Sequence, residues 1–188
     1  MTTQTIKVGI CGLGTVGQGV IALLSEGGDV LSNRVGGTIE LVHVATRTPK
    51  PEVDTLGARD SRDVFDVARD PDVDVLIELI GGTTVAKDLV VEALNHGKHV
   101  VTANKALLAD HGEELFALAE SKGVALRFEA AVAGGIPVIE AVKTSLAGNH
   151  VSSVAGIING TGNFILTEMA AKGRELSLIH ISEPTRRS

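Results

Sequence analysis

The sequence predicts an α/β fold in which helices cover a doubly wound parallel sheet. Two observations support this prediction. Short β-branched runs alternate with segments of helical periodicity over the first 130 residues, and this alternation is typical of right-handed βαβ units. The 188 residues are also 44% hydrophobic, which is enough to bury the core of a full domain and excludes general disorder.

Strands and helices can be assigned in order along this first part. The expected strands are residues 6–11, 39–45, 73–80, 99–102 and 124–128, because each is a short apolar or β-branched run. Three helices are expected in this part: one that follows the first strand as far as Gly27-Gly28, one that runs from Thr84 to Gly97, and one that ends before Gly123. Apolar residues recur there at helical spacing, and glycine commonly ends a helix. Residues 48–63 contain two prolines and many charges, which favours a surface loop.

The pattern changes after Glu129. Residues 130–135 are small and predict a loop, whereas residues 137–146 predict a helix entered through a proline. Residues 151–158 have the pattern of a strand and residues 164–171 that of a helix. This succession indicates the beginning of a second domain.

Composition excludes several classes of function. Lys and Arg number 17 against 23 Asp and Glu, a net charge of −6, which argues against a nucleic-acid partner because duplex binding relies on basic residues. With four Phe and no Tyr or Trp, a base-stacking surface is not expected. Acids or glycines interrupt every apolar run, so no membrane span is expected. A single cysteine, Cys11, and a start without signal-peptide features predict a cytoplasmic protein.

A glycine-rich turn lies between the first strand and the first helix. It comprises Gly12, Leu13, Gly14, Thr15, Val16 and Gly17. In this fingerprint the first glycine allows a tight turn, the second lets backbone N–H groups approach a pyrophosphate, and the third permits close packing of helix on strand. The turn predicts a Rossmann-type dinucleotide site; the alternative is a glycine-rich turn with a structural role alone.

The residue after the second strand bears on which dinucleotide binds. An acid at this place would hydrogen-bond the ribose 2′-hydroxyl and favour NAD. The strand instead ends in Ala45-Thr46-Arg47, and Arg47 suits the 2′-phosphate of NADP. NAD stays possible, because Arg47 also fits the description of an ordinary surface residue.

Two further polar stretches follow strands that should end at the same edge of the sheet. They are residues 81–84, which begin with Gly81, and residues 102–105, which end with Lys105. Ligands of open α/β sheets bind at this edge, so Gly81 is predicted to contact the cofactor. Lys105 is predicted to contact the cofactor and a substrate oxygen; its alternative is an exposed lysine without a role. The histidines show no metal-ligand spacing, and Cys11 is expected to be a core residue.

Over residues 5–175 the chain resembles the homoserine dehydrogenases, which interconvert aspartate 4-semialdehyde and homoserine with NAD(P). The resemblance rests on five blocks: GLGTVG at 12–17, ELIGG at 78–82, GKHVVTANKALL at 97–108, EAAVAGGIP at 129–137 and GIINGTGNFIL at 156–166. The first block is shared by many dehydrogenases, whereas the last three together are close to diagnostic. The resemblance implies an enzyme of threonine, methionine and isoleucine biosynthesis.

The resemblance also implies roles for particular residues. Lys105 matches a lysine at the substrate and nicotinamide site, and Gly160 and Thr161 match a substrate-side turn, although both could simply cap the next helix. A monovalent cation such as sodium is implied at Glu129, through its carboxylate, and at Val132, Gly134 and Ile136, through their carbonyl oxygens. The family forms homo-oligomers.

The resemblance divides the chain into three parts. Residues 1–130 are expected to form the NAD(P)-binding domain, residues 131–176 the start of a truncated α+β substrate domain, and residues 177–188 a foreign tail. The family carries a second active-site lysine and an acidic stretch beyond this point, so little activity is expected of this chain. Two alternatives stay open: another semialdehyde dehydrogenase, which would need an activated cysteine, and a dinucleotide-binding fragment without catalysis.

Overall fold

The computed structural model describes residues 4–156, 160–173 and 175–176. The chain divides into two compact units, Met1–Ala141 and Val142–Ser188, and each is described by itself. No helix within the described ranges is both long enough and apolar enough to cross a membrane.

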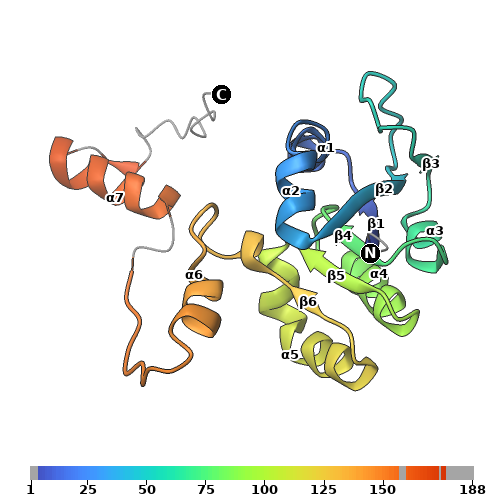
Figure 1. The fold of residues 1–188 in the computed structure, drawn as a ribbon. Coiled ribbons are helices and arrows are strands. Elements are labelled where there is room, and N and C mark those ends of the chain that lie inside the picture. The colour runs from blue at the N-terminus through green and yellow to red at the C-terminus, as the bar shows by residue number, and fades with distance from the viewer. Residues whose placement is uncertain (1–3, 157–159, 174, 177–188) are drawn as a thin grey trace. The chain divides into compact units, whose positions relative to one another are not determined.

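The first unit is built on one six-stranded sheet in which all neighbouring strands are parallel (Figure 1). In chain order the strands are β1 (Gln4–Cys11), β2 (Gly37–Ala45), β3 (Arg59–Ser61), β4 (Val75–Glu78), β5 (His99–Thr102) and β6 (Leu126–Arg127). Their order across the sheet is β3-β2-β1-β4-β5-β6. The order reverses between β1 and β4, and the crevice at such a reversal is where doubly wound sheets bind ligands. The predicted fold class is confirmed.

Helices cover both faces of this sheet. The α-helices of the first unit are α1 (Thr15–Glu26), α2 (Gly28–Val35), α3 (Val64–Arg69), α4 (Thr84–Asn95), α5 (Lys105–Lys122) and the short α6 (Val138–Glu140). One apolar core lies between the sheet and α1, and it includes Ile10, Ile21 and Val44. The other lies between the sheet and helices α3, α4 and α5, and it includes Leu89 and Leu115. The alternation of side chains along each strand supplies both cores.

The second unit contains one further helix, α7 (Gly160–Lys172), in its described residues. A π-helical turn, η2 (Ala141–Ser145), follows α6 directly, so the helix expected over residues 137–146 forms over residues 138–145 but changes from α-helical to π-helical geometry at Ala141. Residues 151–156 form no strand, and the rest of the strand expected over 151–158 lies outside the described residues. Strand-like composition does not produce a strand without a partner to pair with.

Three elements of the first unit differ from expectation. The first helix, α1, ends at Gly27 as expected, but a second helix, α2, which the sequence pattern does not predict, begins at Gly28. The segment 48–63 contains β3, which pairs with the end of β2, and α3 follows directly. The last strand is shorter than expected, because only Leu126 and Arg127 pair with β5.

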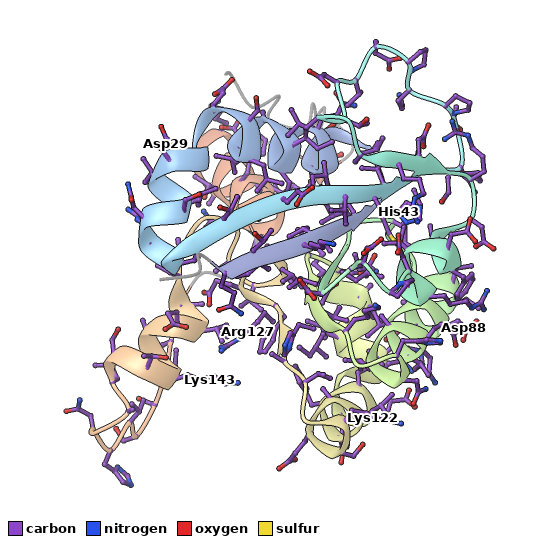
Figure 2. The ribbon with its side chains drawn as sticks, turned by 45° about the vertical axis from the view of Figure 1, so that its right-hand side comes forward. Asp29, His43, Asp88, Lys122, Arg127 and Lys143 are labelled. Carbon is purple, nitrogen blue, oxygen red and sulfur yellow. The ribbon has the colours of Figure 1, made fainter. Side chains whose placement is uncertain are left out.

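A group of ionisable side chains centred on the buried Asp70 joins β2, β3 and the loops that precede β4 and β5. His43, labelled on β2 in Figure 2, and Asp70 are 2% and 4% exposed, and His43 Nδ1 lies 2.6 Å from Asp70 Oδ2. The Arg59 guanidinium donates to the same oxygen at 2.7 Å. The Lys98 ammonium donates to the Asp70 backbone carbonyl at 2.5 Å. Asp70 is therefore the common acceptor of these segments.

The surroundings of Asp70 favour its ionised form. Burial opposes ionisation, but hydrogen bonds from the Asp72 N–H and from His43, with the positive charge of Arg59, outweigh it and hold the pKa of Asp70 below its ordinary value of 3.8. A carboxyl whose pKa is lower in the folded state stabilises the fold above its unfolded pKa, and this contribution is lost as the pH falls. Asp70 should therefore stabilise the domain at neutral pH.

We expect Asp70→Asn to lower the free energy of unfolding by about 3 kcal/mol at neutral pH, because His43 and the Arg59 guanidinium lose their buried, negatively charged acceptor. The difference from wild type should shrink as the pH falls below about 4 and through the lowered pKa of the folded-state carboxyl, because the wild-type carboxyl then also takes up a proton. Denaturant unfolding at neutral and acidic pH measures both effects. Asp72→Asn is the control, because the Asp72 side chain is 54% exposed and exposed ion pairs contribute at most about 1 kcal/mol. Equal losses in the two variants would contradict the role given to burial.

Candidate functional site

The glycine-rich turn after β1 is held tightly at its first and third glycines. Gly12 has a φ of +105°, and a Cβ there would lie 2.6 Å from the carbonyl oxygen of Leu79, at the end of β4. A Cβ on Gly17 would collide with the carbonyl oxygen of Gly12. Both positions therefore require glycine, because the turn packs against β4 on one side and against α1 on the other.

Gly14 lies in open space. Its φ of −72° and ψ of −168° are extended values that any residue adopts, and a Cβ there would meet no heavy atom within 4 Å. Gly14 is the N-cap of α1, which has no side-chain cap and no acidic residue in its first turn. The free N–H groups and the helix dipole at this end suit an anion such as a pyrophosphate. A Cβ at Gly14 would therefore take space from a ligand and not from the protein.

The other residues of the turn divide between core and surface. Leu13 is buried in the core against α1, whereas Thr15 and Val16 are exposed. Gln18, which the sequence analysis does not single out, donates from its side-chain amide to the Leu13 carbonyl oxygen at 3.0 Å. This bond braces the turn from within the first turn of α1.

Arg47 follows β2 at the same edge of the sheet, and it is exposed. Its turn is fixed by neighbours: the Thr46 hydroxyl donates to the Thr48 carbonyl at 3.1 Å. Arg62, which sequence reasoning missed, donates to the Thr46 carbonyl at 3.3 Å and pairs with Asp60 at 2.6 Å. The pairing of β3 with β2 brings Arg62 here, and that strand lies in the segment expected to be irregular.

The turns after β4 and β5 are joined through Asn104. Its side-chain amide donates to the carbonyl oxygen of Gly82 at 2.6 Å, and its side-chain oxygen accepts from the Leu107 N–H at 3.1 Å as the N-cap of α5. Gly81 and Gly82 have φ values of +71° and +73°. Lys105 is exposed and is the first residue of α5. The structure thus brings Gly81 and Lys105 to neighbouring turns.

Glu78 is a second residue that the sequence analysis does not assign. It is fully buried at the end of β4 and accepts hydrogen bonds from both of these turns. An acid near the end of an otherwise apolar run, residues 75–80, is the signal that could have found it.

The segment predicted to hold a cation forms a curled loop after β6. Glu129 begins a short 3-10 helix, η1 (Glu129–Ala131), and its carboxylate accepts from the N–H groups of Ile139 and Glu140 at 3.0 and 2.9 Å. Gly134 has a φ of +60°, which curls the loop. The Ile136 carbonyl accepts from the Val138 N–H at 2.8 Å, and Val132 closes η1 through its N–H.

Gly160 and Thr161 belong to the other unit. Gly160 is exposed and is the first residue of α7, and the side chain of Thr161 lies outside the described residues. Neither residue is placed relative to the edge of the sheet.

Cys11 lacks the environment of a reactive thiol. It is fully buried, and its sulfur donates to the Val64 carbonyl at 3.7 Å. Burial, with the negative charge of Glu78, raises the pKa of the Cys11 thiol far above its ordinary value, so the thiolate needed for nucleophilic attack does not form at neutral pH. Among the described residues no group of three or more His, Cys, Asp and Glu could hold a metal ion.

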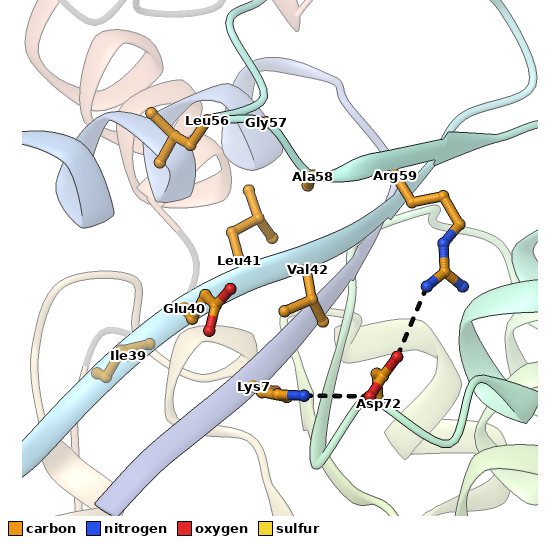
Figure 3. A pocket seen from close by; sticks show the side chains of 10 residues that line it. All are labelled: Lys7, Ile39, Glu40, Leu41, Val42, Leu56, Gly57, Ala58, Arg59 and Asp72. Atoms are coloured by element: carbon orange, nitrogen blue, oxygen red, sulfur yellow. Dashed lines mark hydrogen bonds and ion pairs between the residues drawn. The ribbon is translucent and has the colours of Figure 1, made fainter. Parts of the chain in front are cut away.

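A hollow of about 430 Å³ lies elsewhere, beside β1 and β2 (Figure 3). Three of its four charged side chains form ion pairs: the Lys7 ammonium lies 3.1 Å from Asp72, and the Arg59 guanidinium lies 3.7 Å from Asp72. In the described part of the chain, none of the predicted site residues lines this hollow.

Comparison with known proteins identifies close relatives. A family model described as the NAD binding domain of homoserine dehydrogenase matches residues 12–129. A second model, described as homoserine dehydrogenase, matches residues 137–181, and so reaches into the segment 177–188 that the sequence analysis expects to be foreign.

Individual relatives agree with the family models. Homoserine dehydrogenase of Pseudomonas aeruginosa is 56% identical over 171 residues, which cover 91% of this chain and 39% of that protein. The Bacillus subtilis homoserine dehydrogenase is 46% identical over 168 residues, 88% of this chain and 39% of the relative. The crystal structure of a homoserine dehydrogenase from Thiobacillus denitrificans superposes with a TM-score of 0.87 at 46% identity, covering 93% of this chain and 41% of that one. The chain spans about two fifths of the length of these relatives.

Gly14→Val should lower the affinity for a nicotinamide dinucleotide by roughly 100-fold, because the new side chain fills the space over the N-terminus of α1. The variant should unfold like the wild type, since its backbone geometry suits any residue. Calorimetric titration with NADPH and a thermal melt measure the two effects.

Gly19→Val is the matched control for this test. Gly19 is exposed on the same helix, and a Cβ there would also meet no heavy atom within 4 Å. It should therefore leave the affinity unchanged. Unchanged affinity in Gly14→Val as well would refute the assignment of the turn to pyrophosphate.

Proposed function

The chain belongs to the homoserine dehydrogenase family, and from this premise we propose that it provides the cofactor-binding part of a site that reduces L-aspartate 4-semialdehyde to L-homoserine with NADPH. The observation that carries the proposal is the set of joined turns at one edge of the sheet. The turn after β1 is open to an anion at Gly14, and the turns after β4 and β5 present Gly81 and Lys105. A dinucleotide laid across the switch point would meet all three turns.

The proposed reaction needs a hydride on the aldehyde carbon and a proton on its oxygen. Bound NADPH would supply the hydride. As the carbon–oxygen double bond opens, negative charge develops on the oxygen, and an ammonium held at that place stabilises it. We assign this role to Lys105, which is exposed at the start of α5 and has its backbone fixed by the Asn104 cap. A second group would deliver the proton that completes the hydroxyl of homoserine.

Further parts of the proposal rest on family membership. Gly160 and Thr161, at the start of α7, are proposed to contact the substrate. The protein is proposed to act in the cytoplasm as a homo-oligomer.

The loop after β6 is proposed to hold a monovalent cation such as sodium. The proposed ligands are the carboxylate of Glu129 and the carbonyl oxygens of Val132, Gly134 and Ile136. Hard oxygen donors of this kind suit an alkali cation. The two N–H donors on Glu129 leave further lone pairs on its oxygens, so the residues present fit such an ion. A bound cation would fix the curl of the loop that leads from β6 to α6.

Activity can be tested by grafting residues 5–175 of this chain onto the P. aeruginosa relative in place of its matching segment. The fusion should reduce NADP when given homoserine, and Lys105→Met should lower its kcat/KM by roughly 100-fold, because charge on the substrate oxygen loses its stabilisation. Lys122→Met is the control, since Lys122 is an exposed lysine at the far end of α5 (Figure 2). A fusion that binds NADPH but never turns over would favour a binding role without catalysis. Full activity in Lys105→Met would remove Lys105 from the mechanism.

NADP is proposed as the preferred cofactor, through a charge-assisted bond from Arg47 to the 2′-phosphate. Such a bond contributes about 1.5–3 kcal/mol, so Arg47→Ala should lower the ratio of NADPH to NADH affinity by roughly 10- to 100-fold. Titration of both cofactors measures the ratio. Arg127→Ala serves as the control, because Arg127 is an exposed arginine on β6, four strands away from β2 across the sheet. A ratio that stays constant in Arg47→Ala would make Arg47 a surface residue without a cofactor contact.

A further inference from the structure

Glu78 is a buried charge at the centre of the site that the proposed chemistry does not use. It ends β4, its exposure is 0%, and its neighbours in register on β1 and β5 are the uncharged residues Cys11 and Thr102. Burying a carboxylate removes hydration that must be replaced by hydrogen bonds or by an opposite charge. A carboxylate buried at this cost calls for an explanation in terms of the groups that it holds in place.

Neutral donors surround the carboxylate. Its Oε1 accepts from the backbone N–H groups of Ile80 and Gly81 at 2.9 and 3.3 Å. Its Oε2 accepts from the hydroxyl of Thr102 at 2.6 Å. One oxygen therefore holds the turn after β4, and the other holds the end of β5.

The same bonds continue to the start of α5. The Thr102 hydroxyl accepts from the Asn104 N–H at 3.0 Å, and the Asn104 side chain donates back to the Gly82 carbonyl at 2.6 Å. Glu78, Thr102, Asn104 and the turn at Gly81-Gly82 thus form a closed ring of hydrogen bonds. Lys105 is the next residue along the chain, so the ring fixes the point from which its side chain extends.

We propose that Glu78 is a positioning residue, which acts through Thr102 and Asn104 to hold Lys105 beside the turn at Gly81-Gly82. This inference rests on the proposed function, because it takes the dinucleotide to run from the turn after β1 to Lys105. An apolar side chain of similar size could fill the space but could accept none of the three hydrogen bonds. The ring therefore shapes the side of the crevice where the nicotinamide half lies, on β4 and β5, while the adenosine half lies over β1 and β2.

Two ligands distinguish binding at the two halves of the crevice: NADPH would occupy both halves, whereas adenosine 2′,5′-bisphosphate would occupy only the adenosine half. Thr102→Val keeps the shape of a buried strand residue but removes the hydroxyl that links Glu78 to Asn104. It should weaken NADPH binding by about tenfold, with adenosine 2′,5′-bisphosphate bound as in the wild type. Thr102→Ser restores the hydroxyl and should restore NADPH affinity. Glu78→Gln leaves a single accepting oxygen in place of two, so this variant should show the same selective loss of NADPH affinity.

Val100→Ala controls for a loss of stability alone. Val100 is fully buried on β5 and takes no part in the ring, so this variant should bind both ligands as the wild type does. Selective weakening of NADPH in Thr102→Val, with rescue by Thr102→Ser, supports the proposal.

Three results would overturn it. If Thr102→Val weakens both ligands equally, or neither, the ring has no positioning role although the proposed function stands. If serine fails to rescue, the hydroxyl is not what matters. If the wild-type chain does not bind NADPH, the proposed function fails, and this inference fails with it.

Discussion

The backbone of the turn after β1 lies directly against the end of β4, and the positions of the other turns at this edge depend on that contact. Only glycine fits at Gly12, because a Cβ there would lie 2.6 Å from the carbonyl oxygen of Leu79. Hydrogen bonds lock the same place: the Leu79 N–H donates to the Cys11 carbonyl at 2.8 Å, and the Gly12 N–H donates to the Ala45 carbonyl at 2.8 Å. The ends of β1, β2 and β4 are thereby fixed around the point where the strand order reverses. A rigid edge of this kind lets a site be assembled from separate turns.

Two buried carboxylates lie before and after the same strand and are stabilised differently. Asp70, ahead of β4, is surrounded by His43, Arg59 and Lys98, so its charge ties segments of the fold together. Glu78, at the end of β4, accepts from two backbone N–H groups and a hydroxyl. Neutral donors hold a carboxylate in place with less Coulombic gain than cations provide. This difference agrees with a role in stability for Asp70 and in geometry for Glu78.

The sequence predicted what depends on local pattern. Buried parallel strands are short apolar runs, and the glycine-rich turn at residues 12–17 lies between such a run and a segment of helical periodicity, so the predicted fold class is correct. Pairings distant in sequence could not be predicted in this way. The approach of Arg62 to Thr46 depends on β3, a strand of three residues within a charged segment that resembles a loop. The strand expected over 151–158 failed over residues 151–156, because a strand needs a partner that composition does not reveal.

The central claim is that a nicotinamide dinucleotide lies across the switch point, from the turn after β1 to the start of α5. Amide chemical shifts of the isotope-labelled chain, recorded as NADPH is added, test this claim most directly. The account predicts that the largest changes fall on the N–H groups of Gly14, Thr15, Gly81 and Lys105. Changes confined to the hollow beside β1 and β2, at Lys7, Leu41 and Arg59, would contradict it.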